Sequence, residues 1–541
     1  MERQGFEPWL ARLLARRGVA DAEAAHRFLE PSAADLHDPL GLAGMREAVA
    51  RLDRARRQGE KVAVVGDYDV DGITATALLL AVFRAVGLDA EPILPHRLKD
   101  GYGFQPVHVE RARELGCTLV VTADCGTGSV AAVAAAAAAG IDVVVTDHHL
   151  PGEAVLPAGT VLVNPRQDGC TYPFTDLAAV GLALKLALAL AAHCGRELPL
   201  DSLLRIACLG TIADLVPLHG ENRVIAALGL QALGRTRSVG LQALFRCASV
   251  RPPFSAVDVG FRLGPRINAA GRLDDARQAL DLLLTRDAAV ASRLAAELDR
   301  LNRERQEEER HVVDEARERL TALSPRPRFA VSWCEGWHRG VVGIAAGRLA
   351  RDLNRPVVLL SVEGSRATGS GRSIPGVELH GFLSRWKTRY ERFGGHAQAI
   401  GMTVAADRLE ELARSWEEAA AEWPEEILAR RYEYEMAIAA GDAGEEMLAG
   451  LDRLEPHGQG NPRPLLRVGP LRLAAPPRPF GRGHLTAVAR GPEGASLRLL
   501  GWRWQERAGS LGGDFEVLGY LERDTYRGGV VLRLVDARPA A

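Results

Sequence analysis

The chain has 541 residues, of which 47% are hydrophobic and 25% are charged, a balance typical of globular proteins. At about 100 to 200 residues per domain, this length predicts three or four domains with clefts between them. The formal net charge of −2 excludes a uniformly basic surface for nucleic acid, so any such surface must be a local groove. The longest apolar run, residues 177–192, is too short to span a membrane and contains Lys185.

Two further bulk features favour a reducing compartment. The first residues show no basic leader followed by an apolar core, so we expect a cytoplasmic protein. The seven cysteines include no C-x-x-C pair, and they fit reduced thiols better than a disulfide frame or a zinc ribbon.

The first half of the chain predicts a helical preface and an α/β domain. Residues 1–45 predict the preface, in which no catalytic pattern is visible. Strand-like and helix-like runs then alternate, which is the pattern of a doubly wound parallel sheet and predicts an α/β domain over residues 46–284. The runs are, in order, residues 62–65, 74–86, 119–122, 130–139, 143–146, 177–192 and 203–212.

The second half predicts three further parts. Residues 285–320 contain neither Gly nor Pro and predict one connecting helix of about 50 Å. A second, smaller α/β domain is expected over residues 321–435, and five short strands within 450–541 predict a small barrel of the oligonucleotide-binding (OB) type. The expected elements of the smaller domain are a strand at 328–333, a helix at 341–353, a strand at 356–362, a Gly/Ser-rich segment at 369–373, and a helix at 409–431 broken at Pro424.

Acidic residues recur directly after the apolar runs of the first α/β domain. They are Asp69, Asp71, Asp124, Asp147 with His148 and His149, and Asp214. In a doubly wound sheet such positions meet beyond the carboxyl ends of the strands. Carboxylates packed this closely repel one another unless divalent cations hold them. A lone D-x-D pair is more often a turn or a cap, but its repetition at strand ends favours a metal cluster.

The donor types indicate the metal. Carboxylate and imidazole ligands without thiolate fit Mn²⁺ or Mg²⁺, with Mn²⁺ preferred, while Zn²⁺ and Fe²⁺ stay open. Five or six ligands are too many for one ion that keeps positions for substrate and water, so we expect two ions about 3.5 to 4 Å apart. Such a pair suits in-line attack of water at phosphorus.

Four segments resemble motifs one to four of the DHH phosphoesterases in order and separation. They are Gly66–Gly72, Thr122–Gly126, Asp147–His149 and Ala213–Pro217. Four more segments resemble the RecJ family of that superfamily, which are single-strand-specific 5′→3′ exonucleases. These are Pro95–Gly103, Gly264–Arg272, Gly336–Ile344 and Gly394–Ala399.

The resemblance implies a DHH catalytic domain at 46–284, a DHHA1 domain at 321–435 and an OB-like domain at 450–541. Many small DHH enzymes carry a His at the position of Val65, and the resemblance implies that Asp67 replaces that ligand here. Asp147 and His149 are implied to orient the ligands or to protonate the leaving oxygen. The other implied metal ligands are Asp69, Asp71, Asp124, His148 and Asp214.

The resemblance also implies contacts to the nucleic acid. The segment Ser370-Gly371-Arg372-Ser373 is implied to hold a 5′ phosphate together with Arg97, because hydroxyl, N–H and guanidinium donors in a tight Gly turn suit an anion. A plain surface turn is the alternative. His396 is implied to face the metals, or it simply donates to a carbonyl. Candidate strand contacts, each alone open to being solvated surface, are Tyr102, Arg266, Asn268, Arg272, Asn302 and Gln306.

Trp502 and Trp504 lie two apart on a predicted strand of the barrel and would therefore share one face. Stacking on bases and packing in the barrel core are both open for this pair.

As a whole the resemblance implies a metal-dependent exonuclease that degrades single-stranded DNA from its 5′ end to mononucleotides in DNA repair and recombination. It implies single-stranded-DNA-binding protein and helicases as partners, no membrane contact, and a monomer. A DHH phosphodiesterase for short oligonucleotides, cyclic dinucleotides or pyrophosphate is disfavoured by the long helix and the barrel, because such relatives are typically shorter. A non-catalytic strand-binding scaffold is disfavoured by the complete set of carboxylates.

Overall fold

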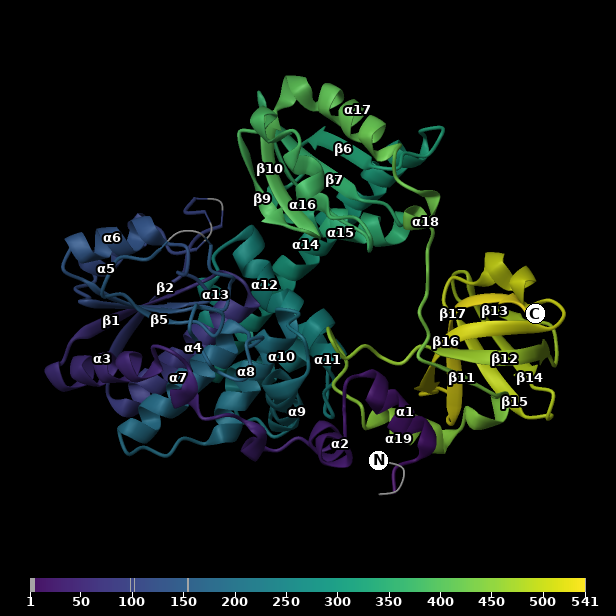
Figure 1. The fold of residues 1–541 in the computed structure, drawn as a ribbon, viewed down its shortest axis with the longest axis horizontal. Coiled ribbons are helices and arrows are strands. Elements are labelled where there is room, and N and C mark those ends of the chain that lie inside the picture. The colour runs from purple at the N-terminus through teal and green to yellow at the C-terminus, as the bar shows by residue number, and fades with distance from the viewer. Residues whose placement is uncertain (1–4, 98, 102, 153–154, 541) are drawn as a thin grey trace. The chain divides into compact units, whose positions relative to one another are not determined.

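The computed structural model describes residues 5–97, 99–101, 103–152 and 155–540. The chain forms two compact units, and it passes from one to the other more than once (Figure 1). The first unit contains residues Met1–Gly264, Leu280–Ser292 and Glu433–Ala541. The second contains Pro265–Ala279 and Arg293–Tyr432.

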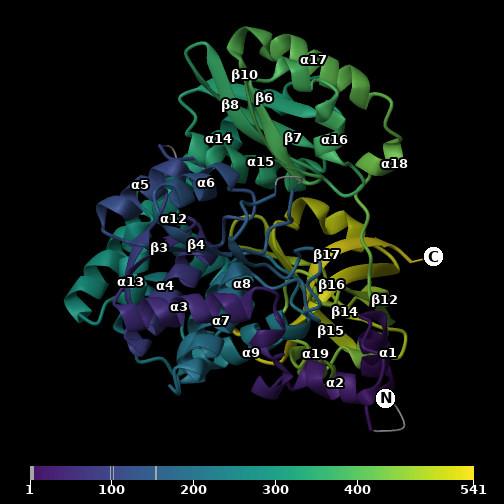
Figure 2. The same cartoon turned by 60° about the vertical axis from the view of Figure 1, so that its left-hand side comes forward.

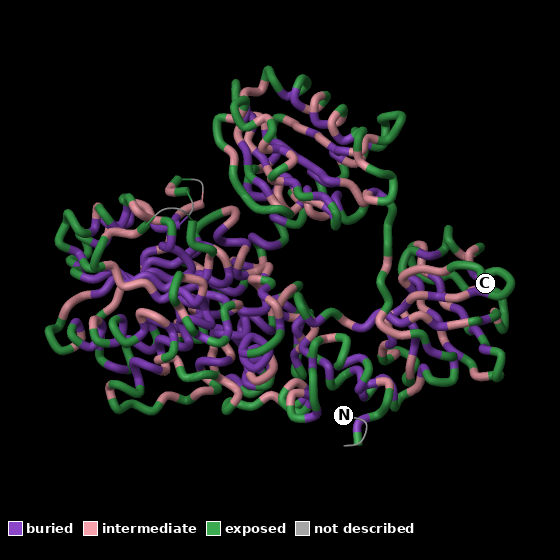
Figure 3. Tube along the Cα trace, viewed as in Figure 1, coloured by how far each residue is buried: buried purple, intermediate pink, exposed green. Residues whose placement is uncertain are grey.

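A five-stranded parallel sheet is the centre of the first unit, so the prediction of a doubly wound parallel sheet is confirmed. The strand order is β2-β1-β3-β4-β5. Buried residues gather around this sheet (Figure 3). Strand β3 is buried along its whole length, as expected for a parallel sheet covered on both faces. The strands are β1 (Lys61–Gly66), β2 (Asp89–Ile93), β3 (Leu119–Ala123), β4 (Asp142–Thr146) and β5 (Val161–Val163).

Helices cover both faces of this sheet (Figures 1 and 2). Helices α5 (Pro106–Glu114) and α6 (Val130–Ala138) lie on one face. On the other face, helices α4 and α7 are apolar on nearly every side because α3 and α8 pack over them. The helices of this face are α3 (Met45–Gln58), α4 (Val70–Val86), α7 (Ala179–His193) and α8 (Leu200–Ala213), followed by α9 (Gly220–Gly234).

The two ends of the chain share one hydrophobic core. Helices α1 (Pro8–Arg16) and α2 (Ala22–Leu29) pack with α19 (Glu445–Asp452) against the C-terminal strands. The helical preface therefore completes the C-terminal module. Five of those strands close into a barrel through the pairing of β12 with β14, which confirms the OB-like prediction. They are β12 (Leu466–Leu473), β14 (His484–Arg490), β15 (Ser496–Gly501), β16 (Phe515–Arg523) and β17 (Val530–Pro539).

The second unit is a smaller α/β structure around a mixed sheet of order β6-β7-β8-β10-β9. Helix α14, which begins in the first unit, packs with α15 on one face, whereas α16 and α17 cover the other. The strands are β6 (Ala330–Glu335), β7 (Val357–Glu363), β8 (Arg366–Arg372), β9 (Arg392–His396) and β10 (Ala399–Ala405). The helices are α12 (Gly264–Leu273), α14 (Ala288–Thr321), α15 (Arg339–Leu353), α16 (Leu379–Ser384) and α17 (Leu409–Ala420).

The secondary structure differs from the sequence prediction in several places. The Gly/Ser-rich segment 369–373 is mostly strand β8 rather than a free turn, and Gly369 is required there because a Cβ would lie 1.9 Å from the Leu359 carbonyl oxygen. The helical stretch expected over 409–431 with a break at Pro424 is shorter than predicted, because α17 ends at Ala420 and only the four-residue helix α18 (Glu425–Leu428) follows Pro424. Strands β2 and β5 were not predicted, because β2 is polar at its exposed edge and β5 has only three residues.

Among the helices of the described residues, none has the length and apolarity that a bilayer crossing requires. The seven cysteines are free thiols.

A buried ion pair joins the sheet domain to the N-terminal segment. The Lys185 ammonium, fully buried on α7, donates to the Glu221 carboxylate and to the His37 carbonyl oxygen at 2.8 Å. The other Glu221 oxygen accepts from the Tyr172 hydroxyl at 2.7 Å. Each charge is therefore compensated only by partners inside the protein.

We expect Lys185→Met to lower the free energy of unfolding by about 3 to 5 kcal/mol, because it leaves the Glu221 carboxylate buried without its cation. Chemical denaturation followed by circular dichroism measures this loss. The double variant Lys185→Met/Glu221→Gln should be less destabilised than the single variant. Equal losses of unfolding free energy in the single and double variants would show that the unpaired charge of Glu221 does not cause the destabilisation.

Candidate metal centre

Three neighbouring strands of the parallel sheet end in the residues that the sequence singled out. Asp67, Asp124 and Asp147 directly follow β1, β3 and β4. These strands are adjacent and parallel, so their carboxyl ends lie at one edge of the sheet.

The D-x-D segment turns from β1 directly into helix α4. One Asp69 oxygen caps that helix by accepting from the N–H groups of Asp71 and Gly72 at 3.0 and 3.1 Å. Gly72 is required at this turn, because a Cβ would lie 2.5 Å from the backbone nitrogen of Asp67. Among the described residues, the second Asp69 oxygen accepts no hydrogen bond and is available to another partner.

Asp71 is held by the start of helix α7. Its two carboxylate oxygens accept from the N–H groups of Ala179 and Val180 at 2.7 and 2.9 Å. These N–H groups belong to the first turn of the helix, where they have no partner within the helix and where the helix dipole favours negative charge. Burial and the charge of Asp69 nevertheless raise the pKa of Asp71 to about 7.

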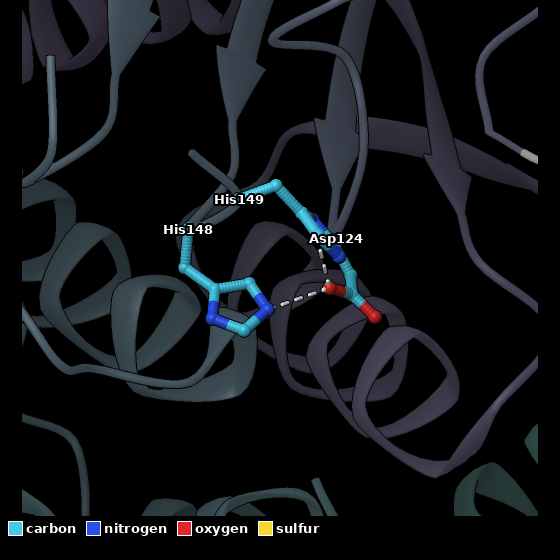
Figure 4. A group of neighbouring side chains, drawn as sticks. All are labelled: Asp124, His148 and His149. Carbon is cyan, nitrogen blue, oxygen red and sulfur yellow. Dashed lines mark ion pairs between the residues drawn. The ribbon is translucent and has the colours of Figure 1, made fainter. Parts of the chain in front are cut away.

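Asp124 and His148 form the centre of the cluster (Figure 4). Asp124 Oδ1 lies 3.2 Å from His148 Nε2, and both atoms are buried without a hydrogen-bond partner. Burial lowers the pKa of His148 to about 4, so its ring is neutral, and burial together with the neighbouring acids raises the pKa of Asp124. Two acceptors facing each other in a buried site repel unless a cation or a proton lies between them.

The acids and imidazoles form three overlapping groups whose ligand atoms lie within 4.8 Å of one another. Asp124 belongs to two groups and His148 to two, as expected if two ions share ligands. Oxygen and imidazole donors without thiolate match Mn²⁺ or Mg²⁺. The groups are Asp67, Asp69 and Asp124; Asp71, His148 and Asp214; and Asp124, His148 and His149.

Asp147 orients the loop that carries the two histidines. Its Oδ1 accepts from the backbone N–H groups of His148 and His149 at 2.8 and 3.2 Å and lies 2.7 Å from His149 Nδ1. Its Oδ2 accepts from Thr127 N at 2.9 Å. Burial alone would raise its pKa, but the bonds from His149 and Thr127 lower the pKa of Asp147 to about 2. Both oxygens are thus occupied, which favours an orienting role.

Asn164 is a site residue that sequence reasoning missed. It is fully buried, and its Nδ2 donates to Thr127 Oγ1 at 3.0 Å and to the His149 carbonyl oxygen at 2.9 Å. It therefore fixes both ends of the hydrogen-bond network around Asp147. The signal in the sequence is the Asn-Pro pair after the short apolar run of β5, which was not recognised as a strand.

Arg97 lies close to the cluster in the same unit. Its guanidinium carbon is 4.1 Å from the centroid of the Tyr68 ring, and its Nε is buried without a hydrogen-bond partner. Tyr68 follows Asp67 directly, so the cation lies beside the acidic edge. Tyr102 lies outside the described residues.

In the second unit, Ser370 and Arg372 lie on β8 beside helix α15. A Cβ placed on Gly343 would lie 3.2 Å from Ser370 Oγ and 3.3 Å from Arg372 Nη2, so this glycine keeps the space beside both donors open. Burial lowers the pKa of Arg372. Ser373 Oγ instead donates to the Val377 carbonyl oxygen at 2.7 Å and so stabilises the following turn.

The other predicted contact residues of the second unit have varied surroundings. Arg266 pairs with Asp299 at 2.9 Å, and Asn302, 1% exposed, accepts from Arg305. Arg272 donates to the Gly340 carbonyl oxygen at 3.3 Å. The remaining three are Asn268, whose Oδ1 is buried without a hydrogen-bond partner, and the exposed residues Gln306 and His396.

The two tryptophans do not lie on a strand, which corrects the prediction that they share a face. Strand β15 ends at Gly501, and Arg503 between them has a φ of 59°. Trp502 is 51% exposed and Trp504 is 4% exposed in the barrel core. A turn with a left-handed residue rotates successive side chains apart, so only Trp502 can meet a ligand.

Comparison with known families places the domains in order along the chain. The model described as the DHH family, N-terminal domain, matches residues 61–211. The DHHA1 domain model matches residues 326–422, and the RecJ OB domain model matches residues 434–535.

Curated relatives match over most of this chain. The single-stranded-DNA-specific exonuclease RecJ of Bacillus subtilis is 40% identical over 471 residues, which cover 86% of this chain and 59% of that protein. The chain thus spans less than two thirds of the length of that relative. RecJ of Salmonella typhimurium is 38% identical over 514 residues, which cover 91% of this chain and 88% of that protein.

A solved structure agrees with this relationship. RecJ from Thermus thermophilus, determined in complex with Mn²⁺, superposes with a TM-score of 0.84 at 32% identity. The match covers 99% of this chain and 76% of that one. Because the domain order, the curated relatives and the structure agree, the chain belongs to the RecJ family of single-stranded-DNA-specific exonucleases.

Proposed function

We propose that the protein is a metal-dependent exonuclease that removes mononucleotides from the 5′ end of single-stranded DNA during DNA repair and recombination in the cytoplasm. The observation that carries the proposal is the buried, unpartnered pair of Asp124 Oδ1 and His148 Nε2 within a complete set of acids. A strand-binding scaffold would have no need of this arrangement.

The proposed ligands bind two divalent ions, with Mn²⁺ preferred and Mg²⁺ accepted. Relatives from Thermus thermophilus were solved with each of these ions, which supports the choice. When bound, such ions polarise a phosphodiester and activate water for attack at phosphorus. The proposed ligands are Asp67, Asp69, Asp71, Asp124, His148 and Asp214.

His149 is the proposed acid for the leaving oxygen. Its Nδ1 is engaged by Asp147 at 2.7 Å, which fixes the ring, and the transferable proton is proposed to lie on Nε2. Burial opposes the charged ring, but the bond and charge of Asp147 raise the pKa of His149 above its ordinary value. The side chain is 41% exposed, so a substrate can reach it. His396 stays a secondary candidate for this chemistry.

Arginine and serine donors are proposed to bind the 5′ phosphate, namely Arg97, Ser370 and Arg372. Arg97 offers an unpartnered buried Nε, and Arg372 with Ser370 borders the open space beside Gly343. Guanidinium groups bind phosphate oxygens through charge-assisted hydrogen bonds, which supports this assignment.

The C-terminal barrel is proposed to bind the single-stranded DNA at nucleotides farther from the 5′ end. A pocket of about 560 Å³ between β14, β15 and the β16–β17 loop is lined by Phe480, Trp502 and Tyr526, with Arg498 beside them. Bases stack on exposed aromatic rings without regard to sequence. Single-stranded-DNA-binding protein and helicases are proposed as partners of a monomeric enzyme.

The decisive experiment incubates 5′- and 3′-labelled single and double strands with Mn²⁺. We expect labelled mononucleotide first from 5′-labelled single strands, with Asp124→Ala at least about 100-fold slower and strand binding retained, because a ligand is lost and not the binding surface. The variant Asp168→Asn, at an exposed position, is the matched control. Near-wild-type hydrolysis by Asp124→Ala would refute the metal centre.

Mn²⁺ should raise the melting temperature more at pH 8 than at pH 6. Burial and neighbouring acids raise the pKa of Asp71 to about 7 and of Asp214 to about 9. An acid with a raised folded pKa stabilises the metal-free protein at low pH, and this stability is lost as pH rises through the folded value. Metal removes that penalty, because bound ligands are deprotonated.

By calorimetry, the rise in melting temperature caused by Mn²⁺ should be at least about 2 °C larger at pH 8 than at pH 6. In Asp214→Asn the difference should shrink. Equal shifts at both pH values in the wild-type protein would contradict proton–metal competition at these acids.

Arg372→Ala should slow the first cleavage of a 5′-phosphorylated strand about 10- to 100-fold, because a charge-assisted contact is worth roughly 1.5 to 3 kcal/mol. On a 5′-hydroxyl strand the same variant should be no slower than the wild type. Arg366→Ala, an exposed arginine of the same strand paired with Glu391, is the control. Equal slowing on both substrates would remove Arg372 from the phosphate site.

A further inference from the structure

Asp214 differs from the other acids in how it is held. Its Oδ2 lies 3.8 Å from His148 Nε2, and among the described residues no hydrogen bond fixes its carboxylate. Asp71, by contrast, is fixed by two backbone N–H groups. Asp214 ends helix α8, so the position of its carboxylate follows from the backbone of residues 214–218.

This backbone has an unfavourable conformation at the next residue. Leu215 has a φ of 62°, in the left-handed region, although it is not a glycine. Its side chain is 70% exposed, so packing of its own does not compensate the strain. A non-glycine residue in this region costs roughly 1 to 3 kcal/mol and persists only where the surroundings hold it.

What holds the loop is a turn from the other end of the chain, residues 456–462, which lead into the barrel. Leu218 N donates to the Gln459 carbonyl oxygen at 2.7 Å. Gly460 has a φ of 70°, and a Cβ on it would lie 2.9 Å from the Cβ of Pro217. A Cβ on Gly458 would lie 2.6 Å from Leu218 Cδ1. The turn and the loop are therefore in direct contact, and glycine is required at position 460, where the φ is positive and a Cβ would meet Pro217.

The turn itself is rigidly held. Asn461 is 1% exposed, and its Nδ2 donates to the carbonyl oxygens of Leu454 and Pro456 at 2.8 and 2.9 Å. Arg223, on the helix that follows the Asp214 loop, donates to the carbonyl oxygens of Leu454 and Glu455 at 3.0 and 2.8 Å. Two sets of hydrogen bonds thus connect the Asp214 side to the 456–462 side. One joins Leu218 to Gln459, and the other joins Arg223 to Leu454 and Glu455.

We infer that the 456–462 turn is a positioning element for Asp214 and sets the metal affinity of the centre. The inference rests on the proposed role of Asp214 as a ligand. On this inference, the turn that leads into the barrel supports the metal site. This role is separate from any contact between the barrel and single-stranded DNA. Gly460 is the positioning residue, since any side chain there must displace Pro217.

The test substitutes Gly460→Ala and measures Mn²⁺ binding by electron paramagnetic resonance titration in the absence of DNA. We expect the weaker of the two Mn²⁺ dissociation constants to rise about tenfold, the size of effect seen when residues behind a ligand are changed. Gly513→Ala is the matched control, because Gly513 also has a positive φ, 64°, and a Cβ on it would meet nothing within 4 Å. Equal Mn²⁺ affinities in the two variants would overturn the inference.

A double-mutant cycle separates positioning from general damage. If the turn acts through Asp214, Gly460→Ala should have no further effect on Mn²⁺ affinity in an Asp214→Asn background. Additive losses would show that the turn acts elsewhere and would overturn the inference. If Asp214→Asn itself leaves Mn²⁺ binding unchanged, the proposed ligand role fails instead.

A second variant tests the same contact from the side of the loop. Leu218→Ala keeps the backbone of the turn and removes the side chain that packs on Gly458. We expect a smaller loss of Mn²⁺ affinity, about threefold, and a metal-free melting temperature below that of Gly513→Ala, because Leu218 is 2% exposed and its truncation removes buried contacts. DNA cleavage by Gly460→Ala and by Leu218→Ala should recover at high Mn²⁺ concentration. A cleavage defect that saturating Mn²⁺ leaves unchanged would contradict a positioning role.

Discussion

Repulsion among buried carboxylates is the constraint on which the rest of the site depends. Desolvation disfavours each charge, and neighbouring acids disfavour it further, so the pKa values of Asp67, Asp71, Asp124 and Asp214 are all raised. A sheet edge that gathers such groups is stable only with compensating positive charge. The fold supplies part of this through the first turn of α7, and the proposed divalent ions supply the remainder.

The acids divide into two classes by the partners of their oxygens. Asp147 has both oxygens occupied by N–H groups and the His149 ring, which favours an orienting role for it. Asp124 has a buried oxygen with no protein partner and faces a neutral imidazole. Aspartates of one cluster therefore differ in what they can bind. Those whose oxygens keep unshared lone pairs can bind a cation, and those whose lone pairs are occupied cannot.

Long-range connections between the ends of the chain support this site. The first two helices complete the core of the C-terminal barrel module. Arg223 then ties that module to the sheet domain by donating to Phe28 and Leu454 carbonyl oxygens. The loop after α8 contacts the turn before the barrel through the hydrogen bond from Leu218 N to the Gln459 carbonyl oxygen. The loop that carries the proposed ligand Asp214 therefore contacts residues about 240 positions away in the chain, which only folding brings near.

By itself the sequence determined the parallel sheet, the acids at its strand ends, and the barrel, because periodicity, strand length and motif spacing are local properties. Tertiary structure alone decided the separate surroundings of Trp502 and Trp504, the incorporation of residues 369–372 into β8, and the hydrogen-bond partners of the two Asp147 oxygens. It also revealed Asn164 and the turn behind Asp214. Each of these depends on which atoms meet across long separations in the chain, and no local pattern encodes that.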